Sequence, residues 1–101
     1  MATNKKYPIY FRSTNRVKGI HYYHAVLTSN RTVTAIHDKN NHMFSLSTCV
    51  NYLVVKKILE AKHLKRISGE QFYNNYLMIR RSLNKQCINV IKSLNLKEQT
   101  K

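Results

Sequence analysis

Hydrophobic and polar residues alternate along the first half of the chain, as they do in half-buried β-strands. Alternating runs occupy residues 7–12, 19–28, 31–37 and 42–46. Ser29 and Asn30 separate the second and third runs, and asparagine favours a tight hairpin there because it tolerates positive φ. Residues 38–41, DKNN, form a second polar turn. The pattern predicts an antiparallel sheet of three or four strands within about residues 7–46.

The second half of the chain has the spacing of amphipathic helices. A first stripe contains Val50, Leu53, Val54, Ile58 and Ala61, and Ser47 precedes it as a candidate cap. Ser68 and Gln71 have the spacing of a capping box, and Ile67 with Phe72 fit a hydrophobic staple. A long stripe follows, made of Phe72, Tyr76, Ile79, Leu83, Cys87, Val90 and Leu94. We predict two or three helices over about residues 47–95, the long stripe being one helix of about 25 residues or two with a break near Asn84.

Pairing the strands through the two turns assigns each side chain to one of two faces. The predicted core face contains Ile20, Tyr22, Val26, Val33, Ala35, Phe44 and Leu46. The opposite face contains His21, Tyr23, Ala25, Leu27, Thr32, Thr34, Ile36, Met43 and Ser45. A register shift of one residue would exchange the faces.

Together these elements predict one small α+β domain over residues 1–101. It has an N-terminal sheet of three or four antiparallel strands, packed by two or three C-terminal helices, and frayed termini. Cys49 and Cys87 form no CxxC pair, and we interpret them as reduced packing residues. No run approaches the roughly 18 apolar residues of a membrane span, and the N-terminus MATNKKYPIY lacks the apolar segment of a signal peptide. We therefore expect a cytoplasmic protein with no membrane partner, in the host cytoplasm if the protein is viral.

Charge is the strongest global feature of the sequence. Lysine and arginine total 18 against four acids, which gives a net charge of +14. So few carboxylates cannot neutralise the cations, so the folded protein carries a positive field that attracts anionic partners. Nucleic acid is the first expected partner and an acidic protein is the second.

The residues of catalysis and metal binding are sparse. Asp38, Glu60, Glu70 and Glu98 are scattered, and no glycine-rich phosphate loop is present. His21 and His24 would point to opposite faces of a strand. His37 and His42 face each other in the predicted register, but two ligands fall short of the four of a structural zinc site. We expect no enzymatic activity, no cofactor and no metal.

Basic residues gather where the predicted sheet turns, and there they can reach phosphates. Side chains of the second face can stack on bases or contact base edges. The long helix offers a second set of phosphate contacts away from its stripe. The predicted nucleic-acid-binding residues are Arg12, Arg16, Lys18, His21, Tyr23, Arg31, Thr32, Thr34, Lys39, Arg80 and Arg81. The alternative is that the long helix or a partner chain covers the second face, because Leu27, Ile36 and Met43 also lie on it.

The predicted function is therefore non-enzymatic nucleic-acid binding. DNA is expected ahead of RNA, because three antiparallel strands followed by a helix is also the order of some β-sheet readers of the major groove. Small size and the lack of catalytic residues suit an accessory or regulatory protein of a phage or mobile element. The alternative is a basic interaction module or inhibitor that docks on an acidic protein or on a protein–nucleic-acid machine. A ribonucleoprotein component is a third option if RNA is preferred, and Tyr73 with Leu77 leave a helix-mediated homodimer open.

Overall fold

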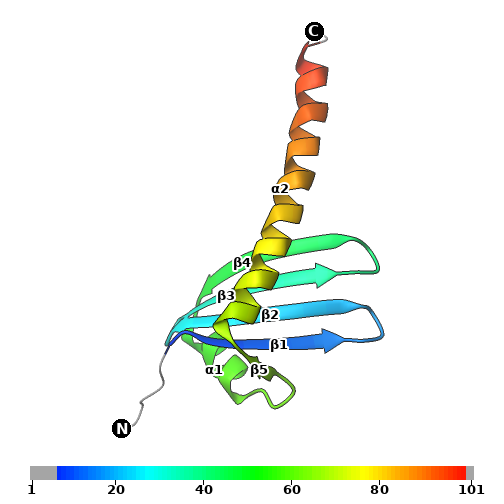
Figure 1. Ribbon diagram of the computed structural model, residues 1–101. Coiled ribbons are helices and arrows are strands. Elements are labelled where there is room, and N and C mark those ends of the chain that lie inside the picture. The colour runs from blue at the N-terminus through cyan, green and yellow to red at the C-terminus, as the bar shows by residue number, and fades with distance from the viewer. Residues whose placement is uncertain (1–6, 100–101) are drawn as a thin grey trace.

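A computed structural model describes residues 7–99 of the chain, with side chains placed for residues 7–94. One antiparallel sheet has the strand order β4-β3-β2-β1-β5, and two helices accompany it (Figure 1). The elements are β1 (Ile9–Asn15), β2 (Ile20–Thr28), β3 (Arg31–Asp38), β4 (Met43–Val50), α1 (Tyr52–Glu60), β5 (Lys65–Ile67) and α2 (Gly69–Gln99). The predicted α+β class is confirmed, with five strands instead of three or four and two helices in this part of the chain.

The β2–β3 hairpin differs from the predicted register by one residue. Thr28 lies opposite Arg31 as expected, but a bulge between Val26 and Thr28 then places Ala25 opposite Val33. A bulge adds a residue to one strand and exchanges the faces beyond it. Tyr23 therefore shares a face with Ala35, and the predicted grouping of Tyr22 and Val26 with Val33 and Ala35 is wrong.

The N-cap of the first helix lies four residues later than predicted. Residues from Ser47 to Val50 continue β4, with Ser47 opposite Thr34 and Val50 opposite Arg31. Asn51 is the actual N-cap, and its side-chain oxygen accepts a 2.8 Å hydrogen bond from the Leu53 N–H. The run of Ser, Thr, Cys and Val favours a pleated strand over a helix once β3 is available as a pairing partner.

The sheet carries a helix on each face. On one face, α2 crosses the strands diagonally and buries Tyr23, Ala25, Ala35, Phe72 and Ile79 (Figure 1). On the other, α1 buries a smaller cluster of Ile9, Val26 and Val55 near the end of the sheet that carries the β2–β3 turn. We call these the α2 face and the α1 face.

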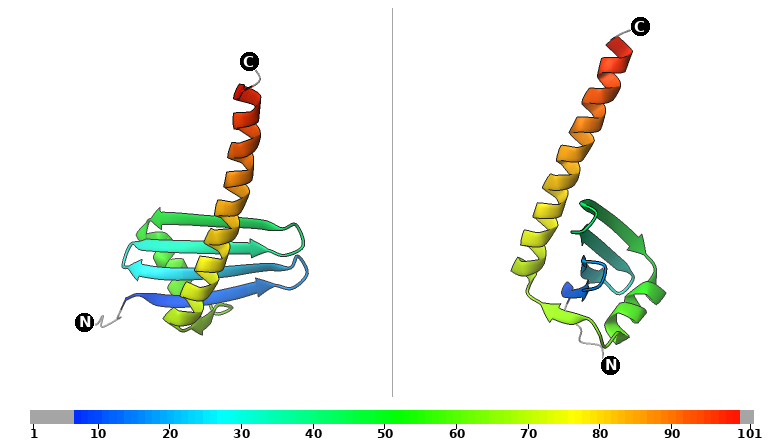
Figure 2. Two further views of the ribbon diagram at one scale, coloured as in Figure 1. Left: turned by 45° about the horizontal axis from the view of Figure 1, so that its top comes forward. Right: turned by 90° about the vertical axis from the view of Figure 1, so that its right-hand side faces the viewer.

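The start of α2 is the predicted capping box. Ser68 Oγ accepts from the Gln71 N–H at 3.1 Å, and Gln71 Oε1 accepts from the Ser68 N–H at 3.1 Å. The helix then runs without a break at Asn84 to Gln99. Its first half lies on the sheet and its second half projects past β4 into solvent (Figure 2). The long stripe is therefore one helix, packed over half of its length.

Candidate nucleic-acid interface

The β1–β2 and β3–β4 turns lie side by side at one end of the sheet (Figure 1), which we call the turn end. The Lys39 N–H donates to the Gly19 carbonyl at 3.0 Å, and Asn40 Nδ2 donates to the Lys18 carbonyl at 3.0 Å. Gly19 has φ of +68°, and a Cβ there would lie 2.7 Å from Asn40 Nδ2. Glycine thus satisfies both the backbone conformation and the close approach. The bonded turns hold the backbones of Lys18 and Lys39 in one fixed arrangement.

Two like charges lie directly opposite each other on the α2 face, at the middle of β1. Arg12 of β1 pairs with Lys65 of β5, and both side chains are exposed. Cross-strand partners have Cβ atoms about 5 Å apart, and like charges in that position are destabilising. An anion between them would relieve the repulsion, so the pair has the chemistry of a phosphate contact.

The next row of the same face is a ladder of ring and hydroxyl side chains. Thr14 pairs with His21, His21 with His37, and His37 with Phe44 across four strands. Thr14 Oγ1 lies 3.3 Å from His21 Nδ1, and the two histidine ring centroids are 6.3 Å apart. The His37 ring stacks on Phe44 with centroids 4.6 Å apart and planes at 15°. This row offers hydrogen-bond donors and a flat ring surface beside the basic pair.

Burial and the positive surroundings both lower the pKa of these histidines. Burial lowers the pKa of His21 below 6.5, and the charges of Lys39 and Arg12 lower it further. Burial also lowers the pKa of His37, with further contributions from His21 and Lys39 that exceed the opposing effect of Asp38. A bound phosphate would reverse the sign of the local field and favour the protonated, doubly donating imidazole.

The acid at this end does not neutralise the cations on the α2 face. Asp38 pairs with Ile20 and so belongs to the α1 face. Its carboxylate accepts hydrogen bonds from the Asn41 N–H and from Asn41 Nδ2, at 3.2 and 2.9 Å. These bonds lower the pKa of Asp38, chiefly through the Asn41 side chain. The carboxylate is engaged within its own turn.

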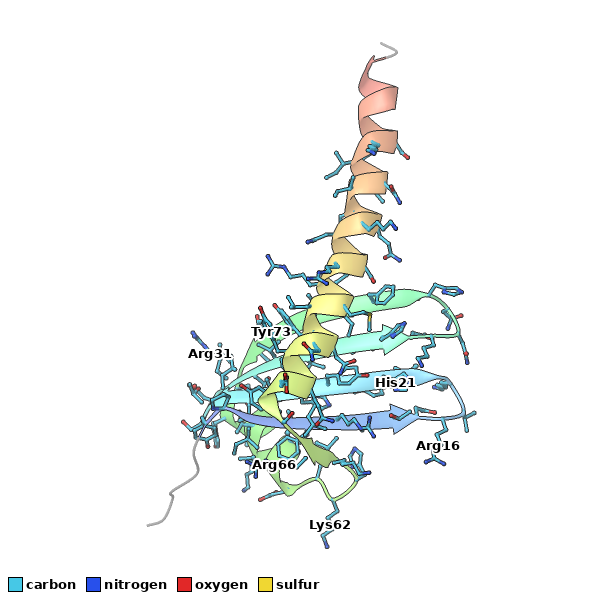
Figure 3. The ribbon with its side chains drawn as sticks, viewed as in Figure 1. Arg16, His21, Arg31, Lys62, Arg66 and Tyr73 are labelled. Carbon is cyan, nitrogen blue, oxygen red and sulfur yellow. The ribbon has the colours of Figure 1, made fainter. Side chains whose placement is uncertain are left out.

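The structure brings together five of the eleven predicted binding residues. Arg16, Lys18 and Lys39 lie in the two turns, His21 lies in the row next to them, and Arg12 lies one row further in, at the middle of β1. Arg31 lies at the opposite end (Figure 3), about 26 Å away for a nine-residue strand. Arg80 and Arg81 are exposed on α2, on the turn between Ile79 and Leu83.

The predicted reading face does not form. Tyr23 is only 8% exposed because α2 covers it, and Thr32 is only 2% exposed on the other side of the sheet. Thr34 also belongs to the α1 face, where its Oγ1 lies 3.1 Å from His24 Nδ1. Tyr23 lies on the α2 face with His21, whereas Thr32 and Thr34 lie on the α1 face. The prediction that these four side chains form one surface is therefore wrong. The covering helix is the alternative that the sequence left open.

Sequence reasoning missed three residues of this surface. Lys65 joins the site only because β5 pairs with β1, and a three-residue strand leaves almost no pattern. His37 and Phe44 lie on adjacent strands and become direct neighbours only through the β3–β4 register. Alternation within 31–37 does place His37 on the face of Val33 and Ala35, which was the available signal. We call Arg12, Arg16, Lys18, His21, His37, Lys39, Phe44 and Lys65 the turn-end surface.

The described residues also bear on two other classes of protein, metal-binding proteins and membrane proteins. No cluster of three or more His, Cys, Asp or Glu within the described residues could hold a metal ion. Between residues 7 and 99, neither helix combines the length and the apolarity needed to cross a membrane. Comparisons with protein-family models, with curated proteins and with solved structures find no match for this chain.

Proposed function

We propose that this protein is a non-enzymatic nucleic-acid-binding protein that holds backbone phosphates on its turn-end surface. The observation that carries the proposal is the Arg12–Lys65 pair, two cations directly opposite each other with exposed side chains. Lys39 adds its charge to the field at His21 beside this pair. Such a set is stabilised by a polyanion, and the net charge of +14 supplies the long-range attraction.

The width of the sheet argues for binding from outside the grooves. Neighbouring strands are about 4.8 Å apart, so the end formed by β1 to β4 spans about 14 Å between its outer backbones. The major groove of B-DNA is about 12 Å wide. A four-stranded end therefore rests on phosphates and does not enter the groove, which favours recognition of backbone shape over base sequence. Duplex DNA, as first expected, and RNA both present such a backbone. The experiment below compares the affinity of the protein for each of them.

The test is a salt series of fluorescence anisotropy titrations with duplex DNA, single-stranded DNA and RNA of matched length. Counterion release gives a log–log slope of about −0.9 per phosphate contact on duplex. We expect a slope of about −4 for the chain. Removing both charges in Arg12→Ala/Lys65→Ala should reduce the magnitude of that slope by about 2.

The matched control is Lys56→Ala/Lys57→Ala, which removes the same charge from exposed positions on α1. If both double variants weaken binding equally, net charge alone is responsible and the turn-end surface is not the site. If the chain binds none of the three polymers even at low salt, nucleic-acid binding is overturned. The acidic-protein partner then becomes the function to test.

A further inference from the structure

The two edges of the sheet are built differently. At one edge, β5 is three residues long and carries Lys65 and Arg66, which discourage pairing with another chain. At the other, β4 is eight residues long with the sequence MFSLSTCV, without charge or proline. Its pairing with β3 is regular from Val50 opposite Arg31 to Met43 opposite Asp38. An edge of this kind presents a free row of N–H and C=O groups as a template for a further strand.

The projecting half of α2 extends past that same edge. Gln86 Nε2 donates to the His42 carbonyl at 3.3 Å, which marks where the helix leaves the sheet. Beyond it, the stripe that packs Leu83 onto the sheet continues as Cys87, Val90 and Leu94 with no sheet beneath. Figures 1 and 2 show this segment running past β4 and away from the other strands. We call residues 87–94 the overhang.

The overhang presents a neutral apolar side to this space. Each residue turns the helix by about 100°, so Arg81, Lys85 and Lys92 lie roughly opposite the stripe. The positions flanking it are the uncharged Gln86, Asn89 and Ser93. A short helix segment with this composition is marginal in water without packing. Neither the stripe nor β4 offers the cations that a nucleic acid requires.

We propose that both surfaces are covered by a second copy of this chain. Two β4 strands pair antiparallel about a two-fold axis and join the sheets into one. An isologous contact needs a self-complementary surface, and an uncharged strand meets this condition without like charges facing each other. Pairing centred on Leu46 keeps the α2 face of both copies on one side, because opposite residues in an antiparallel pair share a face.

This arrangement also gives the overhang a partner. Each α2 extends past its own β4 and comes over the sheet of the other copy, with the stripe facing inward. A strand edge alone buries less than the roughly 1,200 Å² at which stable interfaces begin. The half-exposed Val90, Ile91 and Leu94 supply additional apolar area next to that edge. The two unpartnered surfaces thus serve one interface.

The test is the molar mass of the purified chain by sedimentation velocity, without nucleic acid, at about 0.1 and 0.5 M salt. We expect a dimer whose dissociation constant falls several-fold at the higher salt, because each copy carries +14 and salt screens their repulsion. Nucleic-acid binding responds to salt in the opposite direction, so failure of one proposal is distinguishable from failure of the other.

Ser45→Lys/Ser47→Lys places four lysines at the paired edges and should give a monomer that stays folded, since both positions are exposed. The control with the same added charge is Ser29→Lys/Asn74→Lys, at exposed positions outside β4, and it should remain dimeric. A wild-type chain that is monomeric at both salts and at about millimolar concentration overturns the proposal. So does a dimer that survives the β4 variant but is lost in Val90→Lys/Leu94→Lys, because the helices alone would then hold it together.

Discussion

The two halves of α2 share one apolar stripe and differ in what lies under it. Phe72 and Ile79 are buried against the sheet, whereas Val90 and Leu94 are 57% and 52% exposed on the same side of the same helix. Periodicity is identical in the two halves, so it predicts that a helix forms and which side is apolar. It does not say whether the covering partner is the same chain or another one.

The difference also separates two sources of helix stability. The packed half is held by burial and by the capping box at Ser68. Beyond Gln86, the projecting half holds two asparagines and several β-branched residues, which are poor helix formers on their own. The projecting half extends a helix that the packed half has already nucleated. Extension costs less free energy than nucleation of a new helix. A second copy then contributes the burial that the sheet does not.

The largest expected difference between the halves comes from removing the same side chain in each. Ile79→Ala should lower the free energy of unfolding by about 2–5 kcal/mol, because Ile79 is fully buried and its loss leaves a cavity. Ile91→Ala, 53% exposed, should change it by less than about 0.5 kcal/mol in the monomer. Urea unfolding followed by circular dichroism measures both, at a concentration where sedimentation shows the monomer. Equal losses would mean that the projecting half is packed within one chain.

The next effect compares a serine at each end of the helix. Ser68→Ala removes the cap hydrogen bond to the Gln71 N–H and should destabilise the chain by about 1 kcal/mol. Ser93 donates instead to the carbonyl of Asn89, one turn back in the projecting half. That contact competes with the helix, and alanine is the better helix former, so Ser93→Ala should be neutral or slightly stabilising. Thermal melts of the two variants test the opposite signs, and a loss of stability in Ser93→Ala would contradict the comparison.

Local signals in the sequence predicted the parts of the fold that local chemistry decides. The capping box at Ser68, the stripe from Phe72 and the tight turn at Ser29 and Asn30 are each set by residues a few positions apart. The second turn was predicted one residue too early, at 38–41: it occupies residues 39–42, so His37 lies opposite Phe44 and not His42. The predicted cap of the first helix was wrong by four residues because both Ser47 and Asn51 are good capping residues. Asn51 caps the helix in place of Ser47 because residues 47–50 pair with β3 and continue β4.

The candidate site was less predictable because it depends on contacts between distant segments. The bulge between Val26 and Thr28 shifts the β2–β3 register by one residue and places Tyr23 on the face that α2 covers. The alternation of residues in β2 is compatible with either register, so it could not predict this shift. Lys65 reached Arg12 through a strand too short to leave a pattern. The place of the turn residues Arg16, Lys18 and Lys39 could be predicted because a turn keeps its polar side chains exposed whatever the register.

The smallest expected effect is a pH dependence confined to the packed part of the molecule. His21, His24 and His37 all have pKa values lowered below 6.5, with burial as the largest cause for each. The unfolded chain therefore binds more protons than the folded chain as pH falls below about 6.5. The free energy of unfolding should decrease between about pH 7 and the lower pKa values of the folded state, and the overhang contains no histidine to contribute.

Urea unfolding of the monomer at pH 7.5 and 5.5 measures this decrease, and His21→Gln/His37→Gln should remove part of it. Asp38 acts in a different window, because its lowered pKa contributes stability that is lost only near pH 4 and below. A chain that became more stable on acidification would require histidines that are charged in the folded state. The positive surroundings of His21 would then already be balanced by an anion, which is the condition we assign to the nucleic-acid complex and not to the free protein.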